Sequence, residues 1–138
     1  MSSLPDASVT AVGLDHVKLY ATDPARSRAF YEQALKPLGY RVMIEPAPGV
    51  VGMGATRPDF WIAPADARPT LCHLAFRVDS EQEVAAFHAA GLAAGGTDNG
   101  APGPRPHYHQ NYYGAFVLDR DGNNVEAVYH GLMQPDAA

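Results

Sequence analysis

Gly13-Leu14-Asp15-His16-Val17-Lys18-Leu19-Tyr20 is the first stretch of the chain with the alternation of a β-strand. Successive side chains of a strand point to opposite faces, so His16 and Lys18 share a face that Val17 does not. That face therefore has a histidine at its centre, although the other face is apolar. A histidine in the middle of an otherwise apolar strand indicates a function other than core packing.

The same pattern returns 57 positions later, at Leu71-Cys72-His73-Leu74. Shifting the sequence against itself by the separation of His16 and His73 aligns like residues along both halves: Leu14 with Leu71, Ala29 with Ala86, Phe30 with Phe87, Leu35 with Leu92 and Gly39 with Gly96. Strand histidine, helix face and terminal glycine align at one offset without gaps. The chain is therefore predicted to contain a duplicated unit.

Each half carries a helix signal after its histidine strand. Asp23 is a good N-cap and precedes a proline at the first helical position, while Ser80 opens the capping box Ser-Glu-Gln-Glu. The sequence predicts helices over Pro24–Leu35 and Glu81–Leu92. Gly39 and Gly96 then turn the chain back toward a strand.

Short strand signals separated by Pro and Gly follow each helix. They cover 40–45, 50–54 and 59–63 in the first half. The second half has a strand over 71–79 before its helix, and then a weak signal at 96–98, a Pro- and Gly-rich loop at 99–110, and strands at 112–119 and 123–130. Both halves thus read as β-α-β-β-β. We expect an α+β fold in one domain over 1–138, with module one at 12–63, a linker at 64–70 and module two at 71–131.

Composition restricts the classes of function. The chain has 138 residues, 46% of them hydrophobic, which is enough for one domain with a real core. A net charge of -5 with scattered basic residues disfavours nucleic acid and anionic membranes as partners. The single cysteine, Cys72, excludes an intrachain disulfide. With no signal-peptide pattern and no apolar run of bilayer length, we expect a cytoplasmic protein.

Three strands each place one metal-donor side chain on the face away from the helix of their module. His73 opposes the apolar set of its strand, as His16 does, and Glu126 opposes Val125 and Ala127. Two imidazoles and a carboxylate hold a divalent transition metal and leave positions open for water or substrate. The sequence therefore predicts a metal site at these three donors, provided that the sheets curve so that both modules face one cleft.

Three motifs resemble the vicinal oxygen chelate superfamily, which includes glyoxalase, bleomycin-resistance and extradiol dioxygenase proteins. They are Leu-Asp-His-Val in module one, Cys-His-Leu-Ala-Phe at the matching place in module two, and Asp-Arg-Asp-Gly-Asn-Asn-Val-Glu near the end, and the resemblance covers 12–131. It implies that His16, His73 and Glu126 chelate Fe, Mn, Ni or Zn. It also implies a small substrate bound through neighbouring oxygens, and a homodimer whose cleft lies within one chain or across two.

One departure from the family pattern limits the reaction. Glyoxalase-type members carry a fourth ligand, an acid on the last strand of the first module, where this chain has Trp61; Asp59 lies nearer the strand end. Glyoxalase I activity in its four-ligand form is therefore disfavoured. Oxygenase-type members place a tyrosine on the strand before the glutamate, and the nearest positions here hold Phe116, Tyr113 and Tyr112. Lyase, isomerase and oxygenase chemistry stay open, as does the alternative of a non-catalytic, bleomycin-resistance-type protein that sequesters a ligand.

Other residues are candidates for the cleft. The aromatic run at 107–113 is expected to line its mouth, with His109 and Tyr113 as candidates for proton transfer. The plain alternative is a surface loop.

Side chains on the predicted inner strand faces suggest substrate contacts. Trp61 and Met53 are candidates for an apolar wall, although core packing explains them nearly as well. Lys18 and Arg77 are candidates for contact with an anionic substrate oxygen, although structural ion pairs also explain them.

Overall fold

The structure is a computed structural model that describes residues 12–67 and 69–131. Its elements are β1 (Val17–Ala21), α2 (Pro24–Ala34), a short 3-10 helix (Lys36–Leu38), β2 (Arg41–Ala47), β3 (Val50–Gly54), β4 (Phe60–Pro64), β5 (His73–Arg77), α3 (Glu81–Ala93), β6 (Thr97–Pro104), β7 (Tyr113–Leu118) and β8 (Asn124–Tyr129). The predicted order of one strand, one helix and three strands is confirmed in both halves. The α+β fold class is confirmed with it.

Each half builds its own four-stranded sheet, with strand orders β1-β4-β3-β2 and β5-β8-β7-β6. β1 runs parallel to β4 and β5 parallel to β8, while the other pairs are antiparallel. The first strand of each half, β1 or β5, therefore lies at a sheet edge, beside the last strand of that half. This pairing sets which side chains of the two strands become neighbours.

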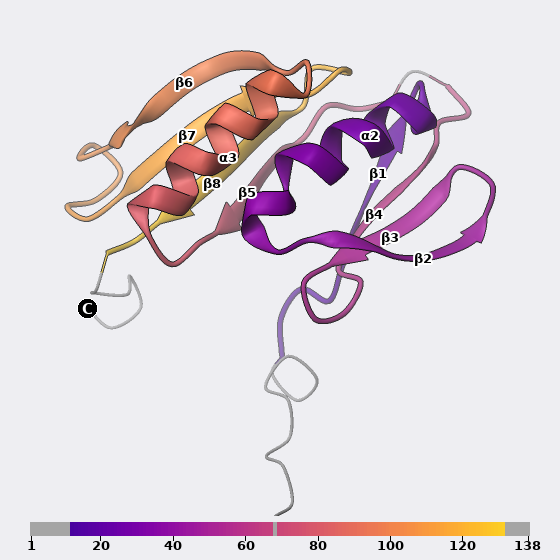
Figure 1. Cartoon of the computed structure of the whole chain (residues 1–138), viewed down its shortest axis with the longest axis horizontal. Helices are drawn as coiled ribbons and strands as arrows, with labels where there is room; N and C mark the ends of the chain where they lie inside the picture. Colours follow the sequence, from indigo (N-terminus) through magenta and orange to yellow (C-terminus); the bar gives the residue numbers. More distant parts are fainter. Residues whose placement is uncertain (1–11, 68, 132–138) are drawn as a thin grey trace, which may run out of the picture.

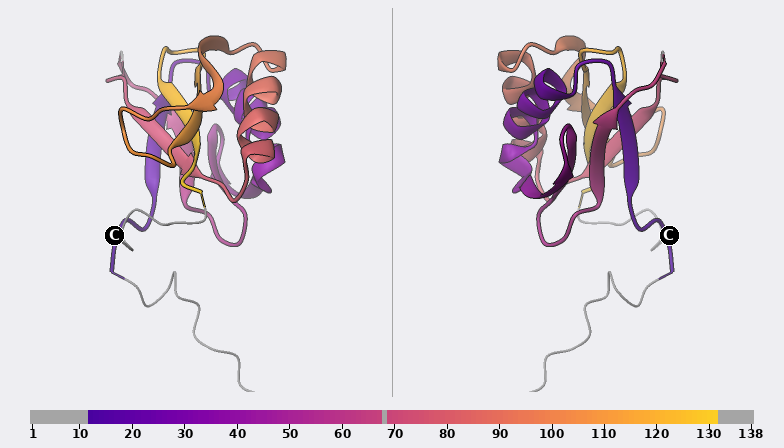
Figure 2. Two further views of the ribbon diagram at one scale, coloured as in Figure 1. Left: turned by 90° about the vertical axis from the view of Figure 1, so that its left-hand side faces the viewer. Right: turned by 90° about the vertical axis from the view of Figure 1, so that its right-hand side faces the viewer.

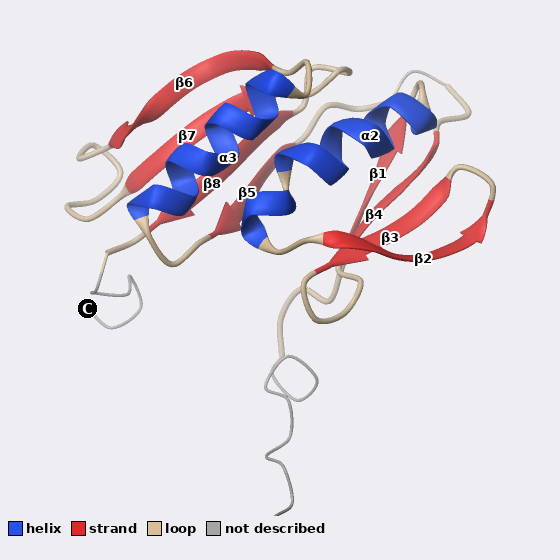
Figure 3. Ribbon diagram, in the orientation of Figure 1, coloured by secondary structure: helices blue, strands red, loops and turns tan. Residues whose placement is uncertain are grey.

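The two helices lie side by side in front of the two sheets (Figure 1). A view from the side shows both helices on one side of the sheets (Figure 2), and the strands and helices separate clearly by layer (Figure 3). No helix of residues 12–67 and 69–131 lies on the opposite face of each sheet, which we call the helix-free face. Within the described residues, no helix is long and apolar enough to cross a membrane.

The predicted caps start both helices. The Asp23 carboxylate accepts a hydrogen bond from the backbone N–H of Arg26 (3.2 Å), and the Ser80 hydroxyl accepts one from Glu83 (3.1 Å). Side-chain oxygens thereby satisfy N–H groups that have no partner inside the helix. Both helices begin at the predicted residue.

The glycine after α3 differs from the prediction. Gly95, with φ of 99°, makes the left-handed turn, and Gly96 has another role. A Cβ on Gly96 would lie 2.4 Å from the Val117 side chain and 2.8 Å from the Phe30 ring. Gly96 therefore allows the end of α3, strand β7 and helix α2 to approach closely.

A single hydrophobic core joins the halves beneath the helices. Aromatic rings form a chain through it, with ring centroids 4.8 Å apart for Tyr31 and Phe60 and 5.6 Å apart for Phe60 and Phe76. Such edge-on contacts add to the free energy gained from burial. The halves are thus packed against each other through their helix side.

Hydrogen bonds from the first half to the turn before β8 fix this arrangement. The Tyr31 hydroxyl donates to Asp119, and the Thr22 hydroxyl donates to Asp121, each over 2.5 Å. Asp119 also accepts from the backbone and side-chain nitrogens of Asn123, both at 2.9 Å. The polar residues of the Asp-Arg-Asp-Gly-Asn motif therefore hold the turn closed and bind it to α2.

Two sequence predictions fail in the strands. The sequence predicts a loop over 99–110, but β6 extends through Pro104. Proline and glycine are tolerated here because β6 is an edge strand whose register is irregular on both sides of Gly100. Met53 was expected on the helix-free face. It is fully buried in the core instead, because the register of β3 puts Gly52 opposite Trp61 on that face.

Candidate metal centre

The structure brings His73 and Glu126 together on the helix-free face of the second sheet. β5 and β8 pair in parallel with Ala75 opposite Glu126, so His73 lies one strand pleat away on the same face. The His73 Nε2 atom is 2.7 Å from Glu126 Oε1. The Glu126 side chain is 1% exposed and that of His73 is 54% exposed. A buried carboxylate thus meets an imidazole that opens to solvent.

The second carboxylate oxygen is bound by Tyr112, whose hydroxyl donates a hydrogen bond to Glu126 Oε2. Burial raises the pKa of the Tyr112 phenol well above its usual value, and the hydrogen bond to Glu126 raises it further. The phenol is therefore a neutral donor. Phe116, which lies opposite Glu126 in register, borders the pair, with its ring centroid 6.1 Å from that of His73.

Of the two neighbouring tyrosines, Tyr112 and not Tyr113 contacts the Glu126 carboxylate. The Tyr113 side chain packs against the hydrophobic core, so it lies away from the carboxylate. The sequence offered Tyr112 beside Phe116 and Tyr113 as positions for a tyrosine near the glutamate. Strand alternation could have singled it out, because counting back in steps of two from Phe116 leads through Gly114 to Tyr112.

His109 lies at the rim of this site in the loop before β7. Its Nδ1 accepts a hydrogen bond from the Asn111 backbone (3.2 Å), so its Nε2 carries the proton and donates to His130 Nδ1 over 2.9 Å. Burial lowers the pKa of His130, and the charges of His109 and Arg77 lower it further, against the opposing charge of Glu126. The His109 ring packs edge-on against Tyr112, with centroids 5.3 Å apart.

His16 was predicted at mid-strand, but it precedes β1 by one residue and lies beside Lys18 and Trp61, apart from the other two donors. Its Nδ1 is 2.8 Å from an Asp15 carboxylate oxygen, and its side chain is 52% exposed. Across residues 12–67 and 69–131, no group of three or more His, Cys, Asp or Glu side chains is placed to hold a metal ion. One chain therefore brings together two of the three predicted donors.

Trp61 occupies the position in the first sheet that Glu126 occupies in the second. Lys18 lies opposite Trp61 as Ala75 lies opposite Glu126, and the residues 18 and 75 are 57 positions apart, like the two histidines. A Cβ on Gly52 would lie 2.8 Å from the indole, which therefore covers that glycine. The second sheet has Phe116 where the first has Gly52. The aromatic ring of this pair is therefore on the last strand in the first sheet, as Trp61 of β4, and on the neighbouring strand in the second, as Phe116 of β7.

The residues predicted to contact the substrate are divided between the two sheets, as the metal donors are. Lys18 borders a shallow pocket of about 390 Å³ together with His16 and Trp61. Arg77 is exposed on β5, opposite Val128 on the face that carries His73. Asp59 binds elsewhere, since its Oδ2 accepts from the Tyr40 hydroxyl at 3.0 Å.

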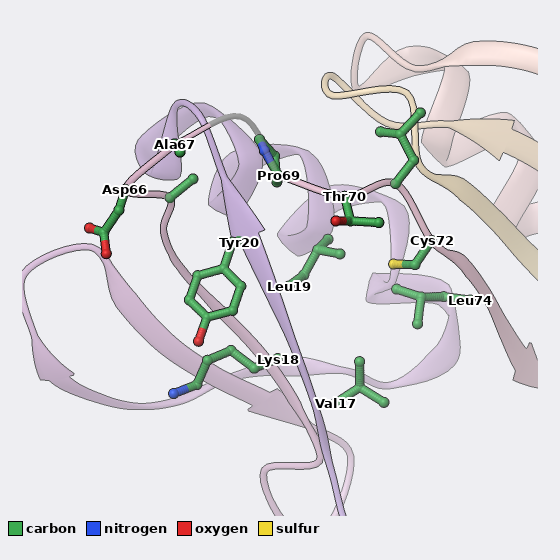
Figure 4. A pocket seen from close by; sticks show the side chains of 12 residues that line it. Val17, Lys18, Leu19, Tyr20, Asp66, Ala67, Pro69, Thr70, Cys72 and Leu74 are labelled. Carbon is green, nitrogen blue, oxygen red and sulfur yellow. The ribbon is translucent and has the colours of Figure 1, made fainter.

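A pocket of about 580 Å³ lies between β1 and the segment that enters β5 (Figure 4). Lys18 and Tyr20 point to one side of β1, and Cys72 and Leu74 line the pocket from the other segment. None of the three metal-donor residues lines it. Burial, with the charge of Asp119, raises the pKa of the Cys72 thiol, so the thiol stays protonated.

Solved structures share this fold. A glyoxalase/bleomycin resistance protein from Albidiferax ferrireducens is 29% identical with a TM-score of 0.71, over 83% of this chain and 95% of that one. A glyoxalase/bleomycin resistance protein/dioxygenase family enzyme from Burkholderia phytofirmans is 21% identical with a TM-score of 0.66, over 86% and 99%. A lactoylglutathione lyase from Agrobacterium tumefaciens is 22% identical with a TM-score of 0.61, over 83% and 90%.

No curated protein matches the chain significantly. The profile of one family matches residues 13–127, which include both histidine strands, both helices and Glu126. The motifs, the paired β-α-β-β-β halves and this match agree. The chain belongs to the Glyoxalase/Bleomycin resistance protein/Dioxygenase superfamily.

Proposed function

We propose that this protein is a metal-dependent enzyme that acts on a small oxygen-rich substrate, and that its metal site is shared by two chains. His73 and Glu126 of one copy and His16 of a second copy are the proposed ligands. The observation that carries the proposal is the 2.7 Å approach of the His73 imidazole to the buried Glu126 carboxylate.

The pair fits a divalent cation chemically. Burying a carboxylate is costly unless a cation or hydrogen-bond donors compensate its charge. Glu126 has such compensation from two donors, on a sheet face that no helix covers. Imidazole nitrogen and carboxylate oxygen suit Fe, Mn, Ni or Zn.

A second copy is proposed because the fold of one chain separates His16 from the pair. The Tyr31–Asp119 and Thr22–Asp121 hydrogen bonds and the shared core hold the halves together through their helix side. The helix-free edges of β1 and β5 stay exposed, with Lys18, Tyr20, Ala75 and Arg77 among the exposed side chains. A homodimer that covers these edges is the arrangement that supplies the third donor.

The bound ion would supply polarisation of neighbouring substrate oxygens and stabilise developing negative charge. Lys18 and Arg77, both exposed on the helix-free faces, are the proposed partners of anionic substrate oxygens. Of the two proton-transfer candidates of the sequence we propose His109 and no longer Tyr113, because the Tyr113 side chain packs against the core. Lyase, isomerase and oxygenase reactions are all compatible with this set.

One observation favours the rival function of a ligand-sequestering protein. Trp61 stands where a fourth ligand would be and presents an indole beside His16 and Lys18. Such an aromatic wall suits the binding of an organic ligand without chemistry. Ligand binding that persists after metal removal, without turnover of the ligand, would identify this function.

Metal analysis of protein purified without chelators tests the proposal directly. We expect the parent to hold about one ion per chain, and His16→Ala and Glu126→Gln each to hold far less. Unfolding temperatures of the variants equal to that of the parent after metal removal exclude loss of the fold as the cause.

Mixing the two variants tests the shared site. In a dimer with one chain of each kind, one site has all three donors and the other lacks two. Random exchange therefore restores about a quarter of the metal content of the parent. Parental metal content in both single variants contradicts the metal site, and a mixture without restored metal contradicts the sharing between chains.

A further inference from the structure

We propose that Tyr112 is a positioning residue that occupies Glu126 Oε2 and so leaves Oε1 as the one oxygen of this carboxylate that a metal ion uses. The inference rests on the proposed metal site. In this inference Tyr112, which is not itself a metal ligand, determines whether Glu126 coordinates the ion through one oxygen or two.

The two oxygens of Glu126 face different partners. Oε1 is 2.7 Å from His73 Nε2, which is the side where a cation would replace the shared proton. Oε2 accepts from the Tyr112 hydroxyl. A carboxylate with both oxygens free can bind a cation through both, whereas one whose second oxygen holds a phenol binds through one.

Gly114 makes the Tyr112 contact possible. A Cβ on Gly114 would lie 3.3 Å from Glu126 Oε2 and 3.3 Å from Tyr112 Cε1. Because this buried position has no side chain, the phenol of Tyr112 reaches across β7 to β8. A methyl group at this position would require the phenol or the carboxylate to shift by a few tenths of an ångström.

The loop before β7 holds the phenol in place. The Tyr112 backbone donates to His109 (3.2 Å) and accepts from Arg105 (2.7 Å). Its ring contacts those of Tyr108, His109 and His130, with centroids 4.7, 5.3 and 5.4 Å away. The His109–His130 hydrogen bond closes this cluster. The phenol therefore has little freedom to leave Glu126, as positioning requires.

Binding of Co²⁺ to the purified protein tests the inference. Affinity is measured by competition with a chromogenic chelator, and coordination number by the intensity of the visible d–d bands, which falls as the number rises. Tyr112→Phe removes the hydroxyl and keeps the ring. Tyr113→Phe is the matched control, because this neighbouring phenol packs against the core.

We expect Tyr112→Phe to bind Co²⁺ about 10- to 100-fold more weakly, with weaker d–d bands as Oε2 joins the coordination sphere. Gly114→Ala changes the bands in the same direction, and Tyr113→Phe binds like the parent. Far-UV circular dichroism checks that each variant is folded.

Parental affinity and bands in Tyr112→Phe overturn the inference and leave the metal site standing, provided that Glu126→Gln loses Co²⁺ in the same assay. Parental binding by Glu126→Gln, or no binding by the parent, overturns the metal site and this inference with it.

Discussion

The hydroxyl of Tyr31, on the first helix, donates to the carboxylate of Asp119, which lies 88 positions later at the turn before the last strand, over 2.5 Å. Tyr31 is 0% exposed and Asp119 is 6% exposed. This buried bond ties the helix of one half to the motif that precedes Glu126. It therefore connects the stability of the chain to the arrangement of its halves.

Tyr31→Phe removes this bond and keeps the ring in the core. We expect the free energy of unfolding to fall by about 1.5–3 kcal/mol, the range for a hydrogen bond to a charged group, as measured by urea denaturation. Tyr108→Phe, at a position 56% exposed, is the control and changes stability little. A Tyr31→Phe variant as stable as this control contradicts the structural role of the bond.

Gly96→Ala tests the close approach of α2, α3 and β7. The added methyl group would overlap Val117 and Phe30, so we expect a loss of about 1–3 kcal/mol or more in the free energy of unfolding. Gly13→Ala meets no atom within 4 Å and serves as the control. Equal thermal unfolding temperatures for the two variants would show that the junction tolerates the methyl group.

Gly52→Ala displaces the only tryptophan of the chain, Trp61, because the new Cβ would lie 2.8 Å from the indole. Trp61 then leaves its position across β3, and we expect its fluorescence emission to shift to longer wavelength as water reaches it. Gly13→Ala, whose added Cβ has no atom within 4 Å, is the control for spectral change. Unchanged emission in Gly52→Ala means that the indole is not held over Gly52.

The His109–His130 pair gives the chain a pH dependence of known sign. The pKa of His130 in the folded chain lies below 6.5, its ordinary value, so the unfolded chain takes up this proton at a higher pH. Between the two pKa values the unfolded state binds more protons, and the free energy of unfolding falls as the pH is lowered through that window.

His130→Gln removes this contribution, and we expect the stability of the variant to depend less on pH from about pH 7 to about pH 5. Urea denaturation at several pH values measures the slope, and His107→Gln, in the loop that holds His109, is the control. If the stability of His130→Gln depends on pH as steeply as that of the parent, other groups cause the pH dependence.

Local chemistry explains why much of the fold was predictable. Asp23 and Ser80 cap helices through side chains that bind the next turn, and strand alternation alone put His73 and Glu126 on one face. These signals act over a few residues, so they are legible in the sequence.

The sequence predictions fail where contacts between distant parts of the chain determine the structure. Strand register, rather than composition, buries Met53 and extends β6 through its prolines. The separation of His16 from His73 follows from the packing of the halves through their helices and from the Tyr31–Asp119 bond, which joins residues that no local pattern relates. The same holds for Tyr112, whose reach to Glu126 depends on the space left at Gly114.

The first sheet pairs Gly52 with Trp61, whereas the second pairs Phe116 with Glu126 at the equivalent position, so the aromatic side chain lies on opposite members of the two pairs. An acid in place of Trp61 alone would uncover Gly52, and a large ring in place of Gly52 alone would collide with the indole. Conversion of the first half to the arrangement of the second therefore involves both positions, 52 and 61, because neither substitution alone reproduces the packing of the second pair.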